Sequence, residues 1–348
     1  MPKQKKITKK KNQPNLLKII ISFSFLFVIG LIGSYLFFQA QKPKQLKTVK
    51  IGLAWINQAQ FAGIYTAIEK GYYEKAGLKV EIEEFDREVA NEIKLAKGDL
   101  DFTISQPVVL INKISEGLKL KAISAIYQTS PLAYLYKSEL QLEKPSDFKG
   151  KTLGIKGDNL AGKILFSAFL SELNLTEKDF HLKQLDFTTH EFDDIQSSTV
   201  DVMGLYRTNQ PYTFDQNGVD YKLILPEDFG FDMYGDVLVT SDEMIEKNPK
   251  LVQKFVDATL KGWEYALENQ DEAVDFTKEY ITSDAYQEVE YNKYILKESA
   301  PIVQVSGAHE IGYMTFDKWD GLYNSMLSFD SSLKGINVDD IFTTQFIE

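Results

Sequence analysis

The stretch "WINQAQFAGIYTAIEKGYYEKAGLKVEI", from Trp55 to Ile82, decides the fold. Its centre carries apolar side chains at i, i+3, i+4 and i+7, which is one face of an amphipathic helix. Gly71 and Gly77 mark the end of that helix, and "LKVEI" then alternates as a strand does. Because "TVKIGLA" at residues 48–54 already reads as a strand, the whole stretch is a β-α-β unit. The four periodic residues are Phe61, Ile64, Tyr65 and Ile68.

The same alternation continues through the chain and starts again near Pro145. Repeated β-α-β units predict parallel sheets with helices on both faces. We therefore expect a bilobed α/β protein, with lobe 1 at residues 48–135 plus 236–348 and lobe 2 at residues 136–235. Two hinge crossings, near residues 133–138 and 233–239, would join the lobes. Open α/β sheets bind ligands at the carboxyl ends of their strands, so the site should lie in the cleft between the lobes.

Composition excludes several classes of function. The chain has no cysteine, and its three histidines, His181, His190 and His309, are not spaced as metal ligands. Arg87 and Arg207 are its two arginines, too few for a multi-arginine phosphate clamp. Seven lysines fall within residues 1–18, and removing their charge from the formal net charge of −11 leaves −18 for the rest. Such an acidic body would repel nucleic acid.

The N-terminus has the pattern of a membrane anchor. Residues 1–18 form a basic tail, residues 19–38 ("IIISFSFLFVIGLIGSYLFF") contain no charge, and residues 39–47 form a polar linker. Twenty helical residues span about 30 Å, the thickness of the bilayer core, and the lysines should stay cytoplasmic. The alternative is a secretory signal cleaved after Ala40, but Phe38 would then occupy a position that requires a small residue. We expect an uncleaved single-pass anchor with an extracytoplasmic body.

Aromatic and amide side chains gather where the predicted strands end. An aromatic face beside neutral amides suits a flat ligand, because the ring stacks while amides both donate and accept hydrogen bonds. Trp55, Asn57, Gln60 and Phe61 follow the first strand, and later strand ends of the same lobe supply Ser105, Gln106, Tyr127 and Gln128. The second lobe and the hinge supply Asp158, Asn159, Asn209, Gln210 and Tyr234.

No pattern supplies a catalytic group. "GDNLAGKI" (Gly157–Ile164) resembles a phosphate-binding loop, but Ile164 stands where a Ser or Thr would hold magnesium. We interpret it as a turn that delivers a helix N-terminus, with Asp158 and Asn159, to the cleft. We therefore expect no enzyme activity, no metal and no cofactor.

The quoted stretch resembles the ABC-transporter substrate-binding family that includes binders of thiamine pyrimidine precursors and the thiamine-pyrimidine synthase. The likeness continues in "GDLDFTIS", "PSDFKGKTLGI", "NQP", "YGDVLVTSDEMIEKNPKLVQKF", "GWEYA" and "DDIFTTQFIE". It implies a type II periplasmic-binding-protein fold, a ligand resembling a thiamine pyrimidine precursor, and ABC permease and ATPase partners. We expect the protein to be a monomer.

The sequence departs from this family at two positions and leaves two other functions open. Phe61 stands where many pyrimidine binders have His, and Gln210 stands where many relatives have Glu. One alternative is a membrane-anchored sensor that signals ligand occupancy to a membrane partner. The other is a pyrimidine-synthase-like enzyme, which the absence of cysteine disfavours.

Overall fold

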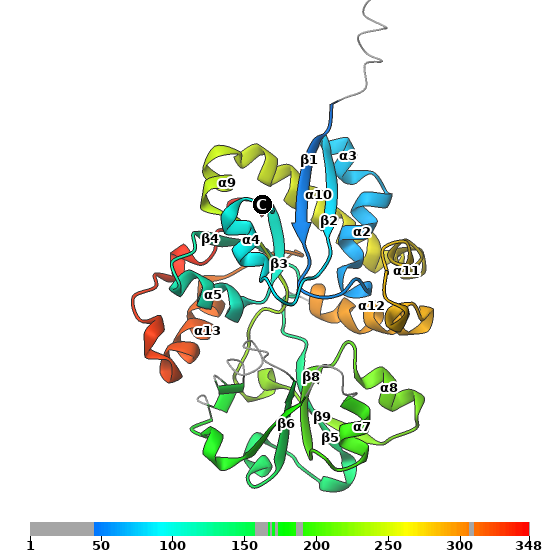
Figure 1. The fold of residues 1–348 in the computed structure, drawn as a ribbon, viewed down its shortest axis with the longest axis vertical. Coiled ribbons are helices and arrows are strands. Elements are labelled where there is room, and N and C mark those ends of the chain that lie inside the picture. Colours follow the sequence, from blue (N-terminus) through cyan, green and yellow to red (C-terminus); the bar gives the residue numbers. More distant parts are fainter. Residues whose placement is uncertain are drawn as a thin grey trace, which may run out of the picture. The chain divides into compact units, whose positions relative to one another are not determined.

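The computed structural model describes residues 45–156, 166–167, 169–170, 173–185, 191–305 and 310–347 (Figure 1). Leu46–Glu348 form one compact unit. Among the described residues, no helix is both long enough and apolar enough to span a membrane. The predicted anchor at residues 19–38 and the predicted turn "GDNLAGKI" at residues 157–164 lie outside the described residues.

The first lobe is built on a five-stranded sheet of order β2-β1-β3-β10-β4. Strands β1, β2 and β3 are parallel, as predicted, but β10 runs antiparallel to both β3 and β4. The expectation of a purely parallel sheet was therefore wrong, because β10 enters this sheet from the second lobe and so in the opposite direction. The strands are β1 (Lys47–Gly52), β2 (Leu78–Glu83), β3 (Phe102–Ser105), β4 (Leu120–Ala125) and β10 (Val237–Ser241).

The opening stretch forms two helices rather than one. A short 3-10 turn, η1 (Ala59–Phe61), leads into α2 (Ala62–Glu69), and α3 (Tyr72–Ala76) follows before β2. Gly71 divides the two helices with φ of 66°, and Gly77 ends the second with φ of 87°. Both angles lie in the left-handed region that glycine adopts without a steric penalty, so these glycines fix the path from helix to strand.

Glycine also allows α2 to approach α10 (Pro249–Glu268) closely. A Cβ atom at Gly63 would lie 2.2 Å from Cγ of Trp263, and one at Gly262 would lie 2.1 Å from the carbonyl oxygen of Gly63. Trp263 is 1% exposed, so this helix contact seals the core on one face of the first sheet. The helices α11 (Gln270–Lys278) and α12 (Val289–Val303) extend the same layer.

A second helical layer covers the opposite face of the first sheet. Side chains of strand β10 point into both layers. Leu238 packs into the apolar cluster on one face of the sheet, and Val237 and Val239 pack into the cluster on the other face. This alternation follows from the two-residue period of a strand, and it confirms helices on both faces. The second layer contains α4 (Asn91–Lys97), α5 (Pro107–Ser115) and α13 (Phe316–Phe329), while α9 (Asp242–Lys247) follows β10.

The second lobe is built on another five-stranded sheet, of order β7-β6-β8-β5-β9. It too is mixed, because β5 runs antiparallel to β8 and β9. The strands are β5 (Leu132–Lys137), β6 (Thr152–Lys156), β7 (His181–Leu185), β8 (Val202–Tyr206) and β9 (Tyr221–Ile224). The lobe also contains α7 (Glu191–Gln196) and α8 (Pro211–Gln216).

The chain crosses between the sheets twice. The first crossing lies between Ala125 and Leu132, earlier than the expected residues 133–138, because β5 already pairs within the second sheet. The second crossing lies between Ile224 and Val237. The two segments bond to each other, since the amides of Ile126 and Tyr127 both donate to the carbonyl oxygen of Asp236, at 2.9 and 3.0 Å.

Candidate functional site

Asp236 is a buried carboxylate at the point where the second crossing enters β10. Its side chain is 2% exposed and accepts a hydrogen bond of 2.7 Å from Nε2 of Gln60. This bond fixes the orientation of the Gln60 amide. Oε1 of Gln60 in turn accepts a 3.0 Å bond from Nε2 of Gln58, which orients the Gln58 amide. The carboxylate thus orders two successive amides from the turn after β1.

Gln106 joins this region to the second lobe. It follows β3 in the first lobe, and its Nε2 donates a 2.6 Å hydrogen bond to the hydroxyl of Tyr206, the last residue of β8. The charge of Asp236 also acts on the hydroxyls of Tyr206 and Tyr127. We call these six residues the interlobe cluster: Gln58, Gln60, Gln106, Tyr127, Tyr206 and Asp236.

The electrostatics of the interlobe cluster disfavour negative charge. Burial raises the pKa of Asp236 from its ordinary value of 3.8 to about 7, although the hydrogen bond from Gln60 acts in the opposite direction. Burial also raises the pKa of Tyr206 and of Tyr127 well above 10, and the carboxylate of Asp236 adds to both shifts. The two phenols therefore remain protonated at neutral pH, while Asp236 is close to its titration midpoint.

The interlobe cluster presents unused hydrogen-bond acceptors. Oδ1 of Asp236, Oε1 of Gln58 and Oε1 of Gln106 are buried, and none accepts a hydrogen bond from the described part of the chain. A buried acceptor without a donor costs about 1–3 kcal/mol. The arrangement is therefore complementary to a molecule that presents N–H or O–H donors.

Three of the predicted site residues belong to this cluster, namely Gln60, Gln106 and Tyr127. Others make local bonds instead. Asn57 accepts a 2.7 Å bond from the hydroxyl of Tyr65, and Ser105 donates to Glu92.

The remaining polar predictions are placed as follows. Gln128 donates to two carbonyl oxygens, those of Ala125 and Tyr313, and so fixes the start of the first crossing. Gln210 accepts a 3.0 Å bond from the amide of Tyr206, while Tyr234 accepts one of 2.8 Å from the amide of Thr315. Both therefore support the chain beside the interlobe cluster.

Phe61 and the second-lobe candidates complete the predicted set. Phe61 is 1% exposed and packs in the apolar core of the first lobe. Asn209 is buried, and its side-chain oxygen accepts a hydrogen bond from the hydroxyl of Thr208. Asp158 and Asn159 lie outside the described residues.

Trp55 lies in an aromatic and cationic group on the first lobe. Its ring centroid is 5.1 Å from that of Phe85, and the guanidinium carbon of Arg87 is 5.7 Å from the ring centroid. Arg207, the other arginine of the chain, forms an ion pair of 2.9 Å with Glu227. The arginine beside a predicted ligand residue is therefore Arg87.

Sequence reasoning missed Asp236 and Tyr206, the centre of the interlobe cluster. Both carry a recognisable signal, since Asp236 directly precedes the apolar strand residues "VLV" and Tyr206 ends a strand. A charged residue at the start of a buried strand requires a partner or a function. That partner, Gln60, lies 176 residues earlier in the chain.

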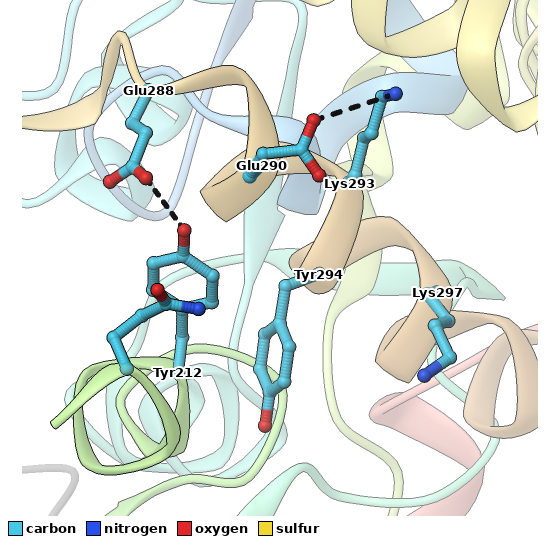
Figure 2. A pocket seen from close by; sticks show the side chains of 7 residues that line it. Tyr212, Glu288, Glu290, Lys293, Tyr294 and Lys297 are labelled. Carbon is cyan, nitrogen blue, oxygen red and sulfur yellow. Dashed lines mark hydrogen bonds and ion pairs between the residues drawn. The ribbon is translucent and has the colours of Figure 1, made fainter. Parts of the chain in front are cut away.

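A pocket opens between α8 of the second lobe and α12 of the first (Figure 2). Its volume is about 370 Å³. The hydroxyl of Tyr212 donates a 2.6 Å hydrogen bond to Glu288, and the ring of Tyr212 lies 5.4 Å from that of Tyr294 (Figure 2). The lining residues are Tyr212, Gln216, Glu288, Glu290, Lys293, Tyr294 and Lys297.

Within the described ranges, no group of three or more His, Asp or Glu side chains could hold a metal ion.

Comparison with known sequences gives one family and several relatives. The sequence profile of the family described as "NMT1/THI5 like" matches residues 58–273. The riboflavin-binding protein RibY of Chloroflexus aurantiacus is 28% identical over 307 residues, covering 87% of this chain and 86% of RibY. The formylaminopyrimidine-binding protein of Halalkalibacterium halodurans is 28% identical over 256 residues, covering 72% of this chain and 76% of that protein.

Solved structures share the fold at low sequence identity. The periplasmic aliphatic sulphonate binding protein SsuA of Escherichia coli matches with a TM-score of 0.68 and 14% identity, covering 86% of this chain and 94% of SsuA. The periplasmic nitrate-binding protein NrtA of Synechocystis matches with a TM-score of 0.60 and 13% identity, covering 87% of each chain. The bilobed type II periplasmic-binding-protein fold predicted from the sequence is confirmed.

Proposed function

The chain belongs to the NMT1/THI5-like family. We propose that it is an extracytoplasmic solute-binding protein of an ABC importer and that its ligand is a flat nitrogen heterocycle bound at the interlobe cluster. Two relatives support this ligand class, because riboflavin and formylaminopyrimidine are both flat nitrogen heterocycles. The family resemblance seen in the sequence is confirmed.

The observation that carries the proposal is the set of three buried acceptor atoms on Asp236, Gln58 and Gln106. Ring N–H and exocyclic amino groups are donors that lie in the plane of the ring, so a flat heterocycle presents its donors at fixed angles. Asp236 also provides the acidic acceptor that Gln210 lacks. Gln210 and Asp236 belong to one region, because Tyr206 interacts with both. The backbone amide of Tyr206 donates to the Gln210 side chain, and the charge of Asp236 raises the pKa of the Tyr206 hydroxyl.

Lobe closure completes this site. The bond between Gln106 and Tyr206 joins residues of different sheets, so it exists only when the lobes meet. A ligand that contacts both sides favours the closed state by its additional contacts there. Ligand binding should therefore reduce the separation of the two lobes.

Calorimetric titration of the full-length chain in detergent tests the proposal, with riboflavin and an aminopyrimidine as probes. We expect one of them to bind, and Asp236→Asn to weaken that binding by about 10- to 100-fold, because a hydrogen bond to a charged group contributes about 1.5–3 kcal/mol. Asp99→Asn, at an exposed position, is the matched control and should bind as the wild type does. Binding of neither probe would contradict the proposed ligand class.

We further propose that residues 19–38 anchor the protein and that an ABC permease and its ATPase are the partners. The support is the uncharged run after a lysine-rich tail and the poor cleavage position at Phe38. N-terminal sequencing of membrane-extracted protein tests the anchor. A chain that starts near Gln41 would instead indicate a cleaved signal.

A further inference from the structure

We propose that the pocket between α8 and α12 is a second part of the ligand site and receives a neutral polyhydroxylated chain attached to the heterocycle. This inference rests on the proposed function and makes it more specific. It distinguishes a heterocycle with a long polyol substituent from a bare pyrimidine.

The chemistry of the pocket suits hydroxyl groups. Glu288 and Glu290 supply acceptors, Lys293 and Lys297 supply donors, and the tyrosine rings of Tyr212 and Tyr294 supply apolar surface. A hydroxyl both donates and accepts, so a chain of hydroxyls can use all of these groups. The volume of about 370 Å³ lies within the range of small-molecule pockets, about 300–1,000 Å³.

The first-lobe wall of the pocket connects directly to the interlobe cluster. The amide of Ala59, between Gln58 and Gln60, donates a 2.9 Å bond to Oδ1 of Asn292 on α12. Nδ2 of Asn292 in turn donates to the carbonyl oxygen of Glu288, also at 2.9 Å. The cluster and this wall are therefore held in fixed register.

The second-lobe wall makes the same connection. Tyr206 of the cluster bonds Gln210 through its amide, and α8 begins directly after Gln210. The amide of Tyr212, on the pocket wall, donates a 3.2 Å bond to the carbonyl oxygen of Asn209, the residue before Gln210. Both walls of the pocket are therefore linked to the interlobe cluster by hydrogen bonds, so a ligand that spans the two would be held by one connected framework.

The charges of the pocket favour a neutral substituent over a phosphate. Its two glutamates and two lysines sum to zero. Lys293 already pairs with Asp271 at 3.2 Å and with Glu290 at 3.6 Å, as Figure 2 shows for the second pair. Lys297 pairs with Glu298 at 3.5 Å. An added dianion would have to compete with these carboxylates.

Titration calorimetry with three flavin-type probes tests the inference in the full-length chain. Riboflavin carries a polyol chain, lumichrome lacks it, and flavin mononucleotide adds a phosphate. We expect riboflavin to bind at least about tenfold more tightly than lumichrome, which corresponds to one or two additional hydrogen bonds. Flavin mononucleotide should bind no more tightly than riboflavin.

Substitutions in the pocket should remove this difference. In Tyr294→Ala and in Lys297→Ala, the ratio of riboflavin to lumichrome affinity should fall to within about threefold, with lumichrome affinity unchanged. Lys297 has an exposed side chain, so its substitution preserves the core even if Tyr294→Ala perturbs α12. Lys278→Ala, at the end of α11, is the matched control and should keep the wild-type ratio.

Two results would overturn the inference while leaving the proposed function intact. One is equal affinity for riboflavin and lumichrome in the wild type. The other is binding of an aminopyrimidine with no binding of riboflavin. If neither flavins nor aminopyrimidines bind, the proposed function fails and this inference fails with it.

Discussion

Replacing Asp236 by Asn should make the protein less sensitive to pH. The carboxyl group binds its proton more tightly in the folded chain, where its pKa is about 7, than at its ordinary value of 3.8. Its contribution to stability is therefore fully present below about pH 4 and is lost as the pH rises toward 7. Each pKa unit corresponds to about 1.4 kcal/mol, so keeping Asp236 ionised costs on the order of 4 kcal/mol. Asn keeps an oxygen that accepts from Gln60 but does not ionise.

Urea unfolding of wild type and Asp236→Asn at pH 5 and pH 8 measures this effect. Linkage predicts that the wild type loses about 2–3 kcal/mol more than the variant between these two pH values. Tyr127 and Tyr206 do not titrate in this range, because burial raises their pKa values above 10. Asp99→Asn should retain the wild-type pH dependence. If Asp236→Asn also retains it, Asp236 does not titrate as a buried group and our reasoning about the interlobe cluster is wrong.

Three further substitutions test the packing, the stacking residue and the contact between lobes. Gly63→Ala should destabilise the fold by about 1–3 kcal/mol in urea unfolding, because its Cβ would lie 2.2 Å from Cγ of Trp263, whereas Gly321→Ala, with open space in α13, should stabilise it by about 0.5–1 kcal/mol. Trp55→Ala should weaken ligand binding about 5- to 150-fold in calorimetry if the ring stacks on the ligand. Unchanged affinity would mean that Trp55 has a structural role in the first lobe. Tyr206→Phe removes the hydroxyl that Gln106 bonds and should populate a more open state. Because the chain has no cysteine, fluorescent labels on Lys79→Cys in the first lobe and Lys222→Cys in the second can report the distance between the lobes. If that distance is unchanged in Tyr206→Phe, the bond between Gln106 and Tyr206 has no role in closure.

Local sequence signals predicted the elements well but predicted the sheet connections less well. The glycines at 71 and 77 mark helix ends because only their own backbone angles matter. Strand β5, in contrast, follows β4 without an intervening helix and enters a different sheet, so its apolar residues do not reveal which partner they have. The antiparallel direction of β10 likewise depends on a crossing that begins about a hundred residues after β4.

The candidate site shows the same limit at the level of single side chains. Asn57 and Gln60 lie three residues apart in the same turn, and both looked equally suited to a ligand. In the folded protein, Asn57 accepts a hydrogen bond from the hydroxyl of Tyr65, whereas Gln60 donates one to Asp236. An amide at a strand end has the same sequence signature in either role. The distinction depends on the residue that tertiary structure places opposite it.

In the proposed site, Asp236 would couple ligand recognition to lobe closure, because it takes part in both the cluster and the crossings. Its carbonyl oxygen accepts the amides of Ile126 and Tyr127 and so ties the two crossings together, while its side chain bonds Gln60. A Cβ atom on the preceding Gly235 would lie 2.7 Å from Cβ of Tyr127, which leaves these segments little freedom to shift relative to each other. A ligand donor bonded to Oδ1 would thus act on the residue that fixes the hinge. It would also relieve the unfavourable burial of the carboxylate in the closed state alone, and such a difference between states is what shifts the equilibrium toward closure.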